Sequence, residues 1–280
     1  MKKWHIIIDV EKCEGCNNCF LACKDEHVDN NFPGYLIAQP NHGHQWMNVM
    51  MKVRGQYPLI DVAYLPLPCM HCDHAPCIGA AKDSAVYKRD DGIVLIDPDK
   101  AKGKRHIVDS CPYGAIWWNE EKEVPQKCTL CAHLLDEGWK EPRCVQVCPT
   151  GALSVRYMEE SKIQSIFEAE ALEVYEPQHK TKPRVYYKNL YRFTKCFISG
   201  SVAVEKEGKY DCATGAEVSL FGDSNNKVDT LITDNYGDFK FDKLEENSGK
   251  YTLEILYPGY KKKTIEIDLK TSFNVGTIFL

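Results

Sequence analysis

Four cysteines near the start of the chain constrain the fold more than any other feature. They follow the pattern Cys13-x-x-Cys16-x-x-Cys19-x-x-x-Cys23. Three cysteines separated by two residues let one tight loop wrap one face of an iron–sulfur cube, and the helical turn that follows carries the fourth toward a second cluster. A tetrahedral zinc site uses well-separated cysteine pairs, so four thiolates within eleven residues favour iron–sulfur binding.

The rest of the composition supports reduced, metal-binding thiolates. The chain has 280 residues and 14 cysteines, most of them in ligand spacings, so we expect metal sites rather than disulfides. Residues 1–10 are a short apolar run that Asp9 ends, which predicts a buried strand and not a signal peptide. No stretch approaches the ~18 apolar residues of a membrane span, and the formal net charge of −5 argues against nucleic-acid binding. We therefore expect a soluble and most simply cytoplasmic protein, unless a translocated partner carries an export signal for both chains.

The chain contains internal repeats of its cysteine runs. Residues 8–23 align with residues 96–111. The runs at 69–77 and 128–144 form a second related pair, with a longer gap before the last cysteine of 128–144. In this register twelve ligand positions hold cysteine and four do not. The four vacant positions are Ala81, Ala101, Lys104 and Ile107.

The pairing of the runs predicts how many clusters the chain holds. In a two-cluster unit each run gives three cysteines to its own cube and the fourth to the partner cube. Pairing the runs in chain order completes only two cubes, whereas pairing outer with outer and inner with inner leaves no cysteine over. We predict three [4Fe–4S] clusters, with the ligands Cys13, Cys16, Cys19 and Cys148 (cluster 1), Cys23, Cys128, Cys131 and Cys144 (cluster 2), and Cys69, Cys72, Cys77 and Cys111 (cluster 3). The four vacancies coincide with the ligand set of a fourth, deleted cube. A degenerate cluster there would need four non-ligands to bind iron.

Four motifs carry a resemblance to a known family. They are Cys-Met-His-Cys-Asp-His-Ala-Pro-Cys at 69–77, Asp-Gly-Ile-Val-Leu-Ile-Asp at 91–97, Cys-Pro-Tyr-Gly-Ala at 111–115 and Lys-Pro-Arg-Val-Tyr-Tyr at 182–187. Residues 1–190 resemble the iron–sulfur subunits of the dimethyl sulfoxide reductase family. The resemblance implies a large partner subunit that carries molybdenum or tungsten on two pterin guanine dinucleotides, with no catalytic residue on this chain. Family members usually hold four clusters, so a relay through this chain would be one cluster short.

The expected fold is α+β, with two domains. Residues 1–195 form a duplicated ferredoxin-like domain, with an inserted hairpin or covering excursion at 29–68, a helix at 158–174 and an extended tail at 176–191. Residues 196–280 resemble prealbumin-like modules and predict an all-β, Ig-like sandwich or barrel with turns at 223–226, 234–237 and 258–259. The seven expected strands lie at 199–205, 216–221, 230–233, 238–241, 250–256, 262–269 and 273–279.

Several other residues have chemistry that these sites do not use. His42 and His44 fit a surface loop, since two close histidines make a poor metal site without a third ligand. We expect His71 and His74 to pack or hydrogen-bond near a cluster, and Lys104 to tune the neighbouring clusters or fill space. Cys196 and Cys212 lack ligand spacing and are expected to be free, buried or half-buried thiols.

Three functions remain open at this point. The first is suggested by the missing cluster together with the terminal β module. This combination resembles a family member whose large subunit moves a hydroxyl group between polyphenols, with a tetrahydroxybenzene co-substrate. The second is an electron relay of a respiratory molybdenum or tungsten reductase or dehydrogenase. The third is a scaffold whose clusters are structural. We expect the β domain to dock or shield a partner.

Overall fold

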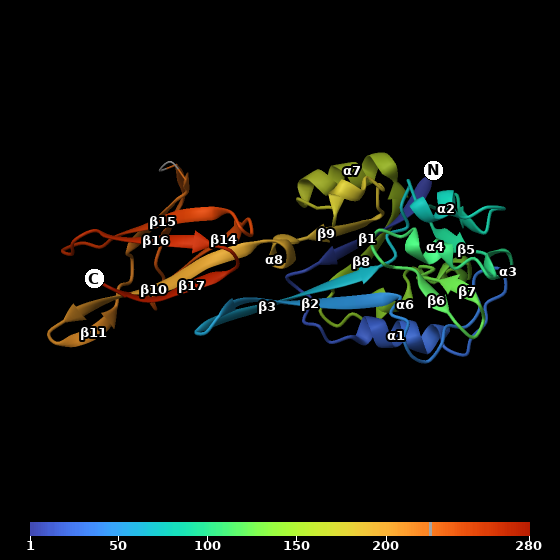
Figure 1. Cartoon of the computed structure of the whole chain (residues 1–280), viewed down its shortest axis with the longest axis horizontal. Coiled ribbons are helices and arrows are strands. Elements are labelled where there is room, and N and C mark those ends of the chain that lie inside the picture. The colour runs from blue at the N-terminus through green and yellow to red at the C-terminus, as the bar shows by residue number, and fades with distance from the viewer. Residues whose placement is uncertain (224–225) are drawn as a thin grey trace. The chain divides into compact units, whose positions relative to one another are not determined.

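The computed structural model describes residues 1–223 and 226–280. The chain forms two compact units (Figure 1). Unit 1 comprises Met1–Met51 and Tyr64–Leu190, and unit 2 comprises Lys52–Ala63 and Tyr191–Leu280. Part of the turn expected at 223–226 lies outside the described residues. Among the described helices, none is both long enough and apolar enough to cross a membrane.

Strand β1 (Lys2–Asp9) is the centre of unit 1. It pairs antiparallel with β8 (Leu153–Glu159) and parallel with β9 (Val185–Lys188), and Figure 1 shows it running between them. The strand predicted at the N-terminus is confirmed, and its run of isoleucines is buried. Because both neighbours come from the last part of unit 1, the sheet brings the two ends of the unit together.

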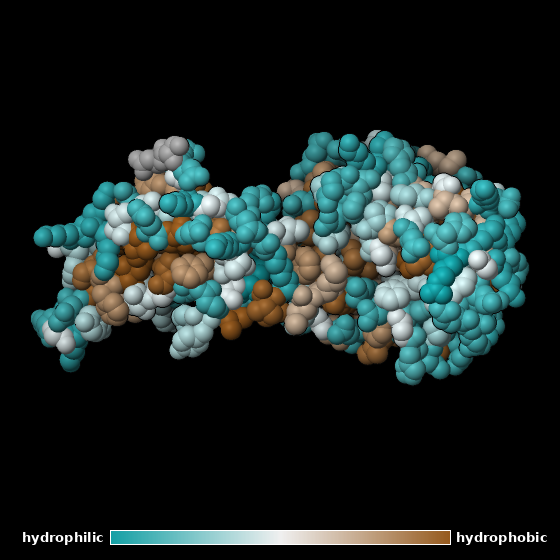
Figure 2. All heavy atoms as spheres, viewed as in Figure 1, coloured by the Kyte–Doolittle hydropathy of each residue, from teal (hydrophilic) through white to brown (hydrophobic). Residues whose placement is uncertain are grey.

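The rest of unit 1 consists mostly of short elements. Two two-stranded ribbons pair β4 (Val86–Lys88) with β5 (Val94–Ile96) and β6 (Trp117–Asn119) with β7 (Val124–Gln126). The helices are α1 (Asn18–His27), α2 (Pro76–Ala80), α3 (Pro98–Ala101), α4 (His106–Asp109), α5 (Ala132–Asp136), α6 (Arg143–Gln146) and α7 (Glu160–Ala169). On the face shown in Figure 2, hydrophilic side chains cover much of this unit.

Helix α7 is shorter than predicted. The expected helix began at Met158, but Met158 and Glu159 belong to β8, where they pair with Lys3 and Lys2 of β1. Pairing with the central strand therefore overrides the helical pattern at this end. The helix still packs on the sheet, with buried Ile163 against Ile7 of β1. The tail that follows contains the short helix η1 (Pro177–His179) and ends in β9, so it clasps its own unit.

The predicted excursion contains a hairpin. Strands β2 (Met47–Gln56) and β3 (Leu59–Pro68) pair, as expected for an inserted hairpin. Its base belongs to unit 1, whereas its tip, Lys52–Ala63, belongs to unit 2.

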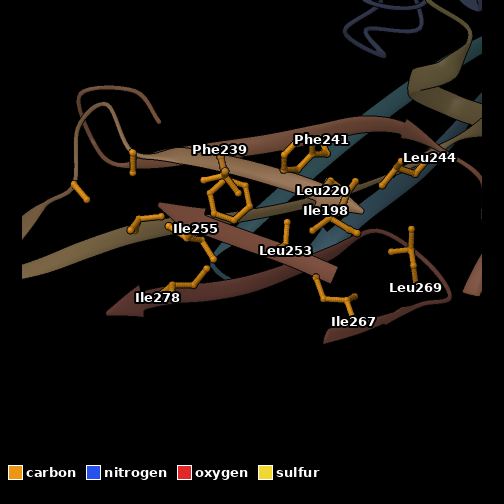
Figure 3. Close-up of a cluster of buried hydrophobic side chains, with 14 of the residues drawn as sticks. Ile198, Leu220, Phe239, Phe241, Leu244, Leu253, Ile255, Ile267, Leu269 and Ile278 are labelled. Atoms are coloured by element: carbon orange, nitrogen blue, oxygen red, sulfur yellow. The ribbon is translucent and has the colours of Figure 1, made fainter. Parts of the chain in front are cut away.

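Unit 2 is a β sandwich. Its first sheet has the order β11-β10-β14, with β17 paired to β10, and its second has the order β13-β12-β15-β16. Inward-facing residues of both sheets meet in one apolar core (Figure 3). A short helix, α8 (Tyr191–Thr194), precedes the strands β10 (Cys196–Lys206), β11 (Lys209–Cys212), β12 (Glu217–Phe221), β13 (Lys227–Ile232), β14 (Asp238–Leu244), β15 (Gly249–Leu256), β16 (Lys263–Leu269) and β17 (Phe273–Phe279).

The described part of residues 196–280 therefore has eight strands where seven were expected. The sequence analysis missed β11, an exposed strand that pairs with the end of β10. All four of its residues are exposed, so it lacks the apolar alternation that marks a half-buried strand. The two thiols expected to be buried or half-buried differ: Cys196 is buried in the core, whereas Cys212 on β11 is exposed.

The hairpin tip brings a buried charge into unit 2. Arg54 is only 1% exposed, and it donates two hydrogen bonds to the Asp242 carboxylate, at 2.8 and 2.9 Å. A third goes to the Arg192 carbonyl at 2.9 Å, and the guanidinium lies 5.1 Å from the centre of the Phe197 ring. Such a charge is tolerated inside a protein because a carboxylate and a backbone carbonyl accept hydrogen bonds from its two terminal nitrogens.

Candidate iron–sulfur sites

The first set of four cysteines, set 1, lies near the end of β1 and the start of β8. Its members are Cys13, Cys16, Cys19 and Cys148. Cys13 and Cys16 lie in the loop between β1 and α1, and Cys19 lies in the first turn of α1. Cys148 lies between α6 and β8, which pairs with β1. These thiols are close enough for their charges to act on one another, and burial is the largest cause that raises the pKa of Cys19 to about 12. Cys16 is exposed, so set 1 reaches the surface.

Gly15 keeps the first loop tight. Its φ of +67° is in the left-handed region, and a Cβ there would lie 2.4 Å from the Tyr64 ring. Any other residue would therefore force the loop away from β3. The backbone of this cysteine run is thus fixed by packing as well as by its sequence spacing.

Set 2 is more deeply buried. Its members are Cys23, Cys128, Cys131 and Cys144. They come from α1, from the loop before α5 and from α6, and all four are buried. Burial, followed by the neighbouring thiols of this set, raises the pKa of Cys144 well above its ordinary value. The Nε2 atom of buried His27 lies 3.8 Å from the Cys131 sulfur.

Set 3 lines a small cavity. Its members are Cys69, Cys72, Cys77 and Cys111. The first three follow β3 and lead into α2, while Cys111 lies just after α4. Burial is the main cause that raises the pKa of Cys72 to about 12, and the charges of the other three thiols add to it. His71, Tyr113 and Lys127 line the same cavity.

The three sets form a row. Cys19 of set 1 acts electrostatically on Cys144 of set 2. Cys69 of set 3 acts in the same way on Cys128 of set 2. Set 2 therefore lies between the other two, an order that the sequence spacing could not give.

Backbone amides point at several of these sulfurs. The N–H of Leu130 donates to the sulfur of Cys128 at 3.3 Å, and the N–H of Ala115 donates to that of Cys111 at 3.4 Å. The N–H of His71 donates to the sulfur of Cys69 at 3.5 Å. Hydrogen bonds to the sulfurs stabilise thiolates and influence the reduction potential of a bound cluster.

The donor chemistry of the three sets fits iron–sulfur clusters. Burial disfavours thiolate anions, as the raised pKa of Cys128, about 11, illustrates. Four thiolates in one buried site therefore need compensating positive charge, which cluster iron supplies when bound. In a cube each thiolate binds a different iron, so the sulfurs spread around the cluster. Within the described residues, no three or more His, Cys, Asp or Glu side chains converge closely enough to hold a single metal ion.

The four positions without cysteine lie in or beside an apolar cluster. Ala101 and Ile107 are completely buried with Cys77, and Ala81 packs at the edge of this cluster. Lys104 turns away from it, since its Nζ donates to the Lys82 carbonyl at 3.2 Å and lies 3.5 Å from an Asp83 carboxylate oxygen. Apolar packing therefore occupies the space beyond set 3.

The histidines have different environments. His42 is exposed, but His44 is buried and its Nε2 lies 3.0 Å from the Trp118 carbonyl oxygen, so only His42 fits the expected surface loop. His71 is buried in the wall of the set 3 cavity, while His74 is exposed. The sequence analysis missed Lys127, whose only signal is its place directly before Cys128.

Comparisons with known proteins identify the family. A family model described as a 4Fe-4S dicluster domain matches residues 60–158. The pyrogallol hydroxytransferase small subunit of Pelobacter acidigallici is 47% identical over 284 aligned residues, which cover 100% of both chains. A putative iron–sulfur subunit of a Halobacterium salinarum dimethyl sulfoxide reductase is 34% identical over 182 residues, covering 54% of this chain and 65% of its own.

A third relative belongs to an enzyme with a different substrate. A tetrathionate reductase subunit of Salmonella typhimurium is 30% identical over 192 residues, which cover 67% of this chain and 73% of its own. The chain therefore belongs to the iron–sulfur subunits of the dimethyl sulfoxide reductase molybdoenzyme family, and its full-length similarity is to a pyrogallol hydroxytransferase small subunit.

Proposed function

We propose that this chain is the three-cluster small subunit of a transhydroxylase that converts pyrogallol to phloroglucinol with a tetrahydroxybenzene co-substrate. The large partner subunit would carry molybdenum on pterin guanine dinucleotides and perform the chemistry. The full-length 47% identity to a pyrogallol hydroxytransferase small subunit supports this choice, since that alignment includes unit 2. The two reductase relatives align to 54% and 67% of this chain.

The proposal assigns one [4Fe–4S] cluster to each cysteine set. The mutual electrostatic influence of the thiols within each set, together with their burial, supports this assignment. Unit 1 would be a duplicated ferredoxin-like domain and unit 2 a prealbumin-like β domain that docks on or shields the partner. Because thiolates need a reducing compartment, the proposal places the complex in the cytoplasm.

The row of sets distinguishes the proposed function from a respiratory relay. Set 1 reaches the surface through Cys16, whereas the far end of the row is packed with apolar side chains around Ala101 and Ile107. A relay to an external partner needs a cluster near each end, and the usual fourth cluster is the one replaced here. A reaction without net redox change needs no such exit. The apolar packing is the observation that carries this choice.

Metal analysis is the first test. The native complex, purified without oxygen and resolved into subunits, should contain about twelve irons on this chain and molybdenum on a larger partner. About eight or sixteen irons would contradict the three-cluster assignment. A complex without molybdenum or tungsten would favour the structural scaffold.

Activity then separates the two enzymatic candidates. The complex should produce phloroglucinol from pyrogallol only when the co-substrate is present, with no external electron acceptor. Turnover that requires an artificial electron donor or acceptor would favour the respiratory relay. Reduction of the clusters by the substrate or by the partner's metal would exclude the scaffold.

One substitution tests the ligand assignment. Cys72→Ser should remove or alter one cluster and leave the other two, because the other sets share no thiol with set 3. The measurement is iron content together with the EPR spectrum of the reduced complex. Cys212→Ser is the matched control, since Cys212 is an exposed thiol of unit 2. An unchanged spectrum and iron content in the Cys72 variant would contradict the assignment.

A further inference from the structure

His71 has a fixed tautomer in the wall of the set 3 cavity. The backbone N–H of Val94 donates to Nδ1 of the imidazole at 3.1 Å. A backbone N–H can only donate, so Nδ1 carries no proton, and the neutral ring carries its proton on Nε2. The imidazole therefore presents an N–H donor on the side opposite Val94.

This donor has no acceptor within residues 1–223 and 226–280. Among the described residues nothing accepts from Nε2, although His71 is only 2% exposed. Leaving a buried N–H without a partner is costly, and native proteins seldom do so. His71 lines the cavity together with the four thiols of set 3, so the sulfurs of a cluster in that cavity are the acceptors within reach.

Lys127 adds a buried cation to the same cavity wall. Its side chain is 2% exposed, and Nζ donates to the carbonyls of Val94 and of Cys128, the latter at 3.1 Å. No carboxylate of the described residues pairs with it. Its charge acts on Cys77 and Cys111 of set 3, and also on Cys128 of set 2. Val94 thus holds both groups, the imidazole through its N–H and the ammonium through its carbonyl.

We propose that His71 donates its Nε2–H to a sulfur of cluster 3, and that the buried Lys127 cation acts with it to make this cluster easier to reduce. A [4Fe–4S] core with four thiolates is an anion, and reduction adds one more negative charge. Hydrogen-bond donors and an unpaired cation both stabilise the reduced state more than the oxidised state, so both raise the midpoint potential. Both are tuning residues, because neither binds iron or substrate.

This inference rests on the proposed function, since it requires a cluster in set 3. Iron content and the Cys72→Ser spectrum test that requirement first. If cluster 3 is absent, the proposed cluster assignment fails. If cluster 3 is present and its midpoint potential does not change in the His71 and Lys127 variants, only the proposed tuning by these two residues fails.

Two substitutions at His71 isolate the Nε2 donor. His71 has a φ of +43°, a region that asparagine tolerates better than most residues. In His71→Asn the side-chain oxygen can still accept from Val94, but the side chain is too short to place a donor where Nε2 lies. In His71→Gln an amide N–H can reach that position. In a redox titration of the complex followed by EPR, cluster 3 should become harder to reduce in His71→Asn and return toward the wild-type potential in His71→Gln.

Lys127→Met tests the cation with a matched control. The variant keeps a flexible, unbranched chain but removes the charge, so the potential of cluster 3 should become more negative while that of cluster 1 stays in place. Lys104→Met makes the same change at a lysine paired with Asp83 outside the cavity, and it should leave all three potentials unchanged. Equal shifts of all three clusters, or no shift of cluster 3 with its iron intact, would overturn the proposal.

A wild-type measurement keeps the proposal testable if a variant fails to assemble. With the complex poised so that cluster 3 alone is reduced, pulsed EPR of protein whose histidines carry ¹⁵N only in the imidazole ring should detect an imidazole nitrogen coupled to this cluster. Ring labelling excludes the His71 backbone nitrogen, which itself donates to the Cys69 sulfur. Absence of that coupling would overturn the hydrogen bond from His71.

Discussion

Unit 2 buries a continuous apolar core between two sheets, whereas unit 1 buries thiols and histidines among its apolar side chains. In unit 2 completely buried residues such as Ile198 of β10, Leu220 of β12 and Leu253 of β15 bring both sheets into one core (Figure 3). In unit 1 several helices have only four or five residues, too few to be stable by themselves. We therefore expect apolar burial to account for the fold of unit 2, and the fold of unit 1 to depend in addition on bonds from its cysteines to metal.

Removal of the iron should give the largest difference in stability between the two units. Because ligand binding and folding share one free energy in small metal-bound domains, chelation of the clusters should unfold most of unit 1 and leave unit 2 folded. Hydrogen exchange read by mass spectrometry should show lost protection along α1, α5 and α6, with β12 and β15 still protected. Equal protection of both units after iron removal would break the comparison.

A cavity in the core of unit 2 should destabilise unit 2 and leave unit 1 unchanged. Leu253→Ala removes a completely buried side chain and should destabilise unit 2 by about 3 kcal/mol. The EPR spectrum of the clusters should stay the same, while calorimetry shows an earlier transition for unit 2. Leu256→Ala on the same strand is the control, because Leu256 is 45% exposed and its loss should change stability little. A changed cluster spectrum in the Leu253 variant would contradict the independence of the units.

Acid should weaken unit 1 through its buried histidines, by a smaller amount. Burial, followed by the charge of Arg184, lowers the pKa of His5 on β1 from 6.5 to about 4. The folded state therefore favours neutral His5, and the stability from this group is complete above pH 6.5 and declines as the pH falls toward 4. Between pH 7 and pH 5 the loss is about 2 kcal/mol.

The His5→Gln variant measures this contribution. Its thermal midpoint should fall less between pH 7 and pH 5 than that of the wild type, because glutamine does not titrate. His42→Gln is the control, since His42 is exposed and should leave the pH dependence as it is. The same acid response in wild type and His5→Gln would exclude the buried imidazole as its cause.

Local patterns in the sequence predicted much of this architecture. Ligand spacing singled out the twelve cysteines, because a loop that binds a cube fixes the separation of its ligands. Apolar runs and turn residues predicted β1, the hairpin of β2 and β3, and most strands of unit 2. Each of these features depends on residues that are close together in the sequence, so the sequence alone is enough to predict it.

Features set by distant residues could not be predicted. The helix expected from Met158 begins later, because pairing with β1 extends β8 through Glu159. The order of the three sets depends on the approach of Cys19 to Cys144 and of Cys69 to Cys128, and neither pair belongs to one run. Lys127 resembles any lysine in the sequence, and only the fold reveals that it is buried beside set 3.

Because the hairpin tip belongs to unit 2, the two units cannot be separated by a single cut in the chain, nor gained or lost in evolution as one continuous segment. The chain passes from one unit to the other at 51/52, at 63/64 and again at 190/191. A protein cut after Leu190 would keep residues 52–63 but lose Asp242, the carboxylate partner of Arg54. Unit 2 is therefore not a simple C-terminal appendage. A lineage that acquired or discarded it would have had to remodel a hairpin encoded more than a hundred codons upstream at the same time.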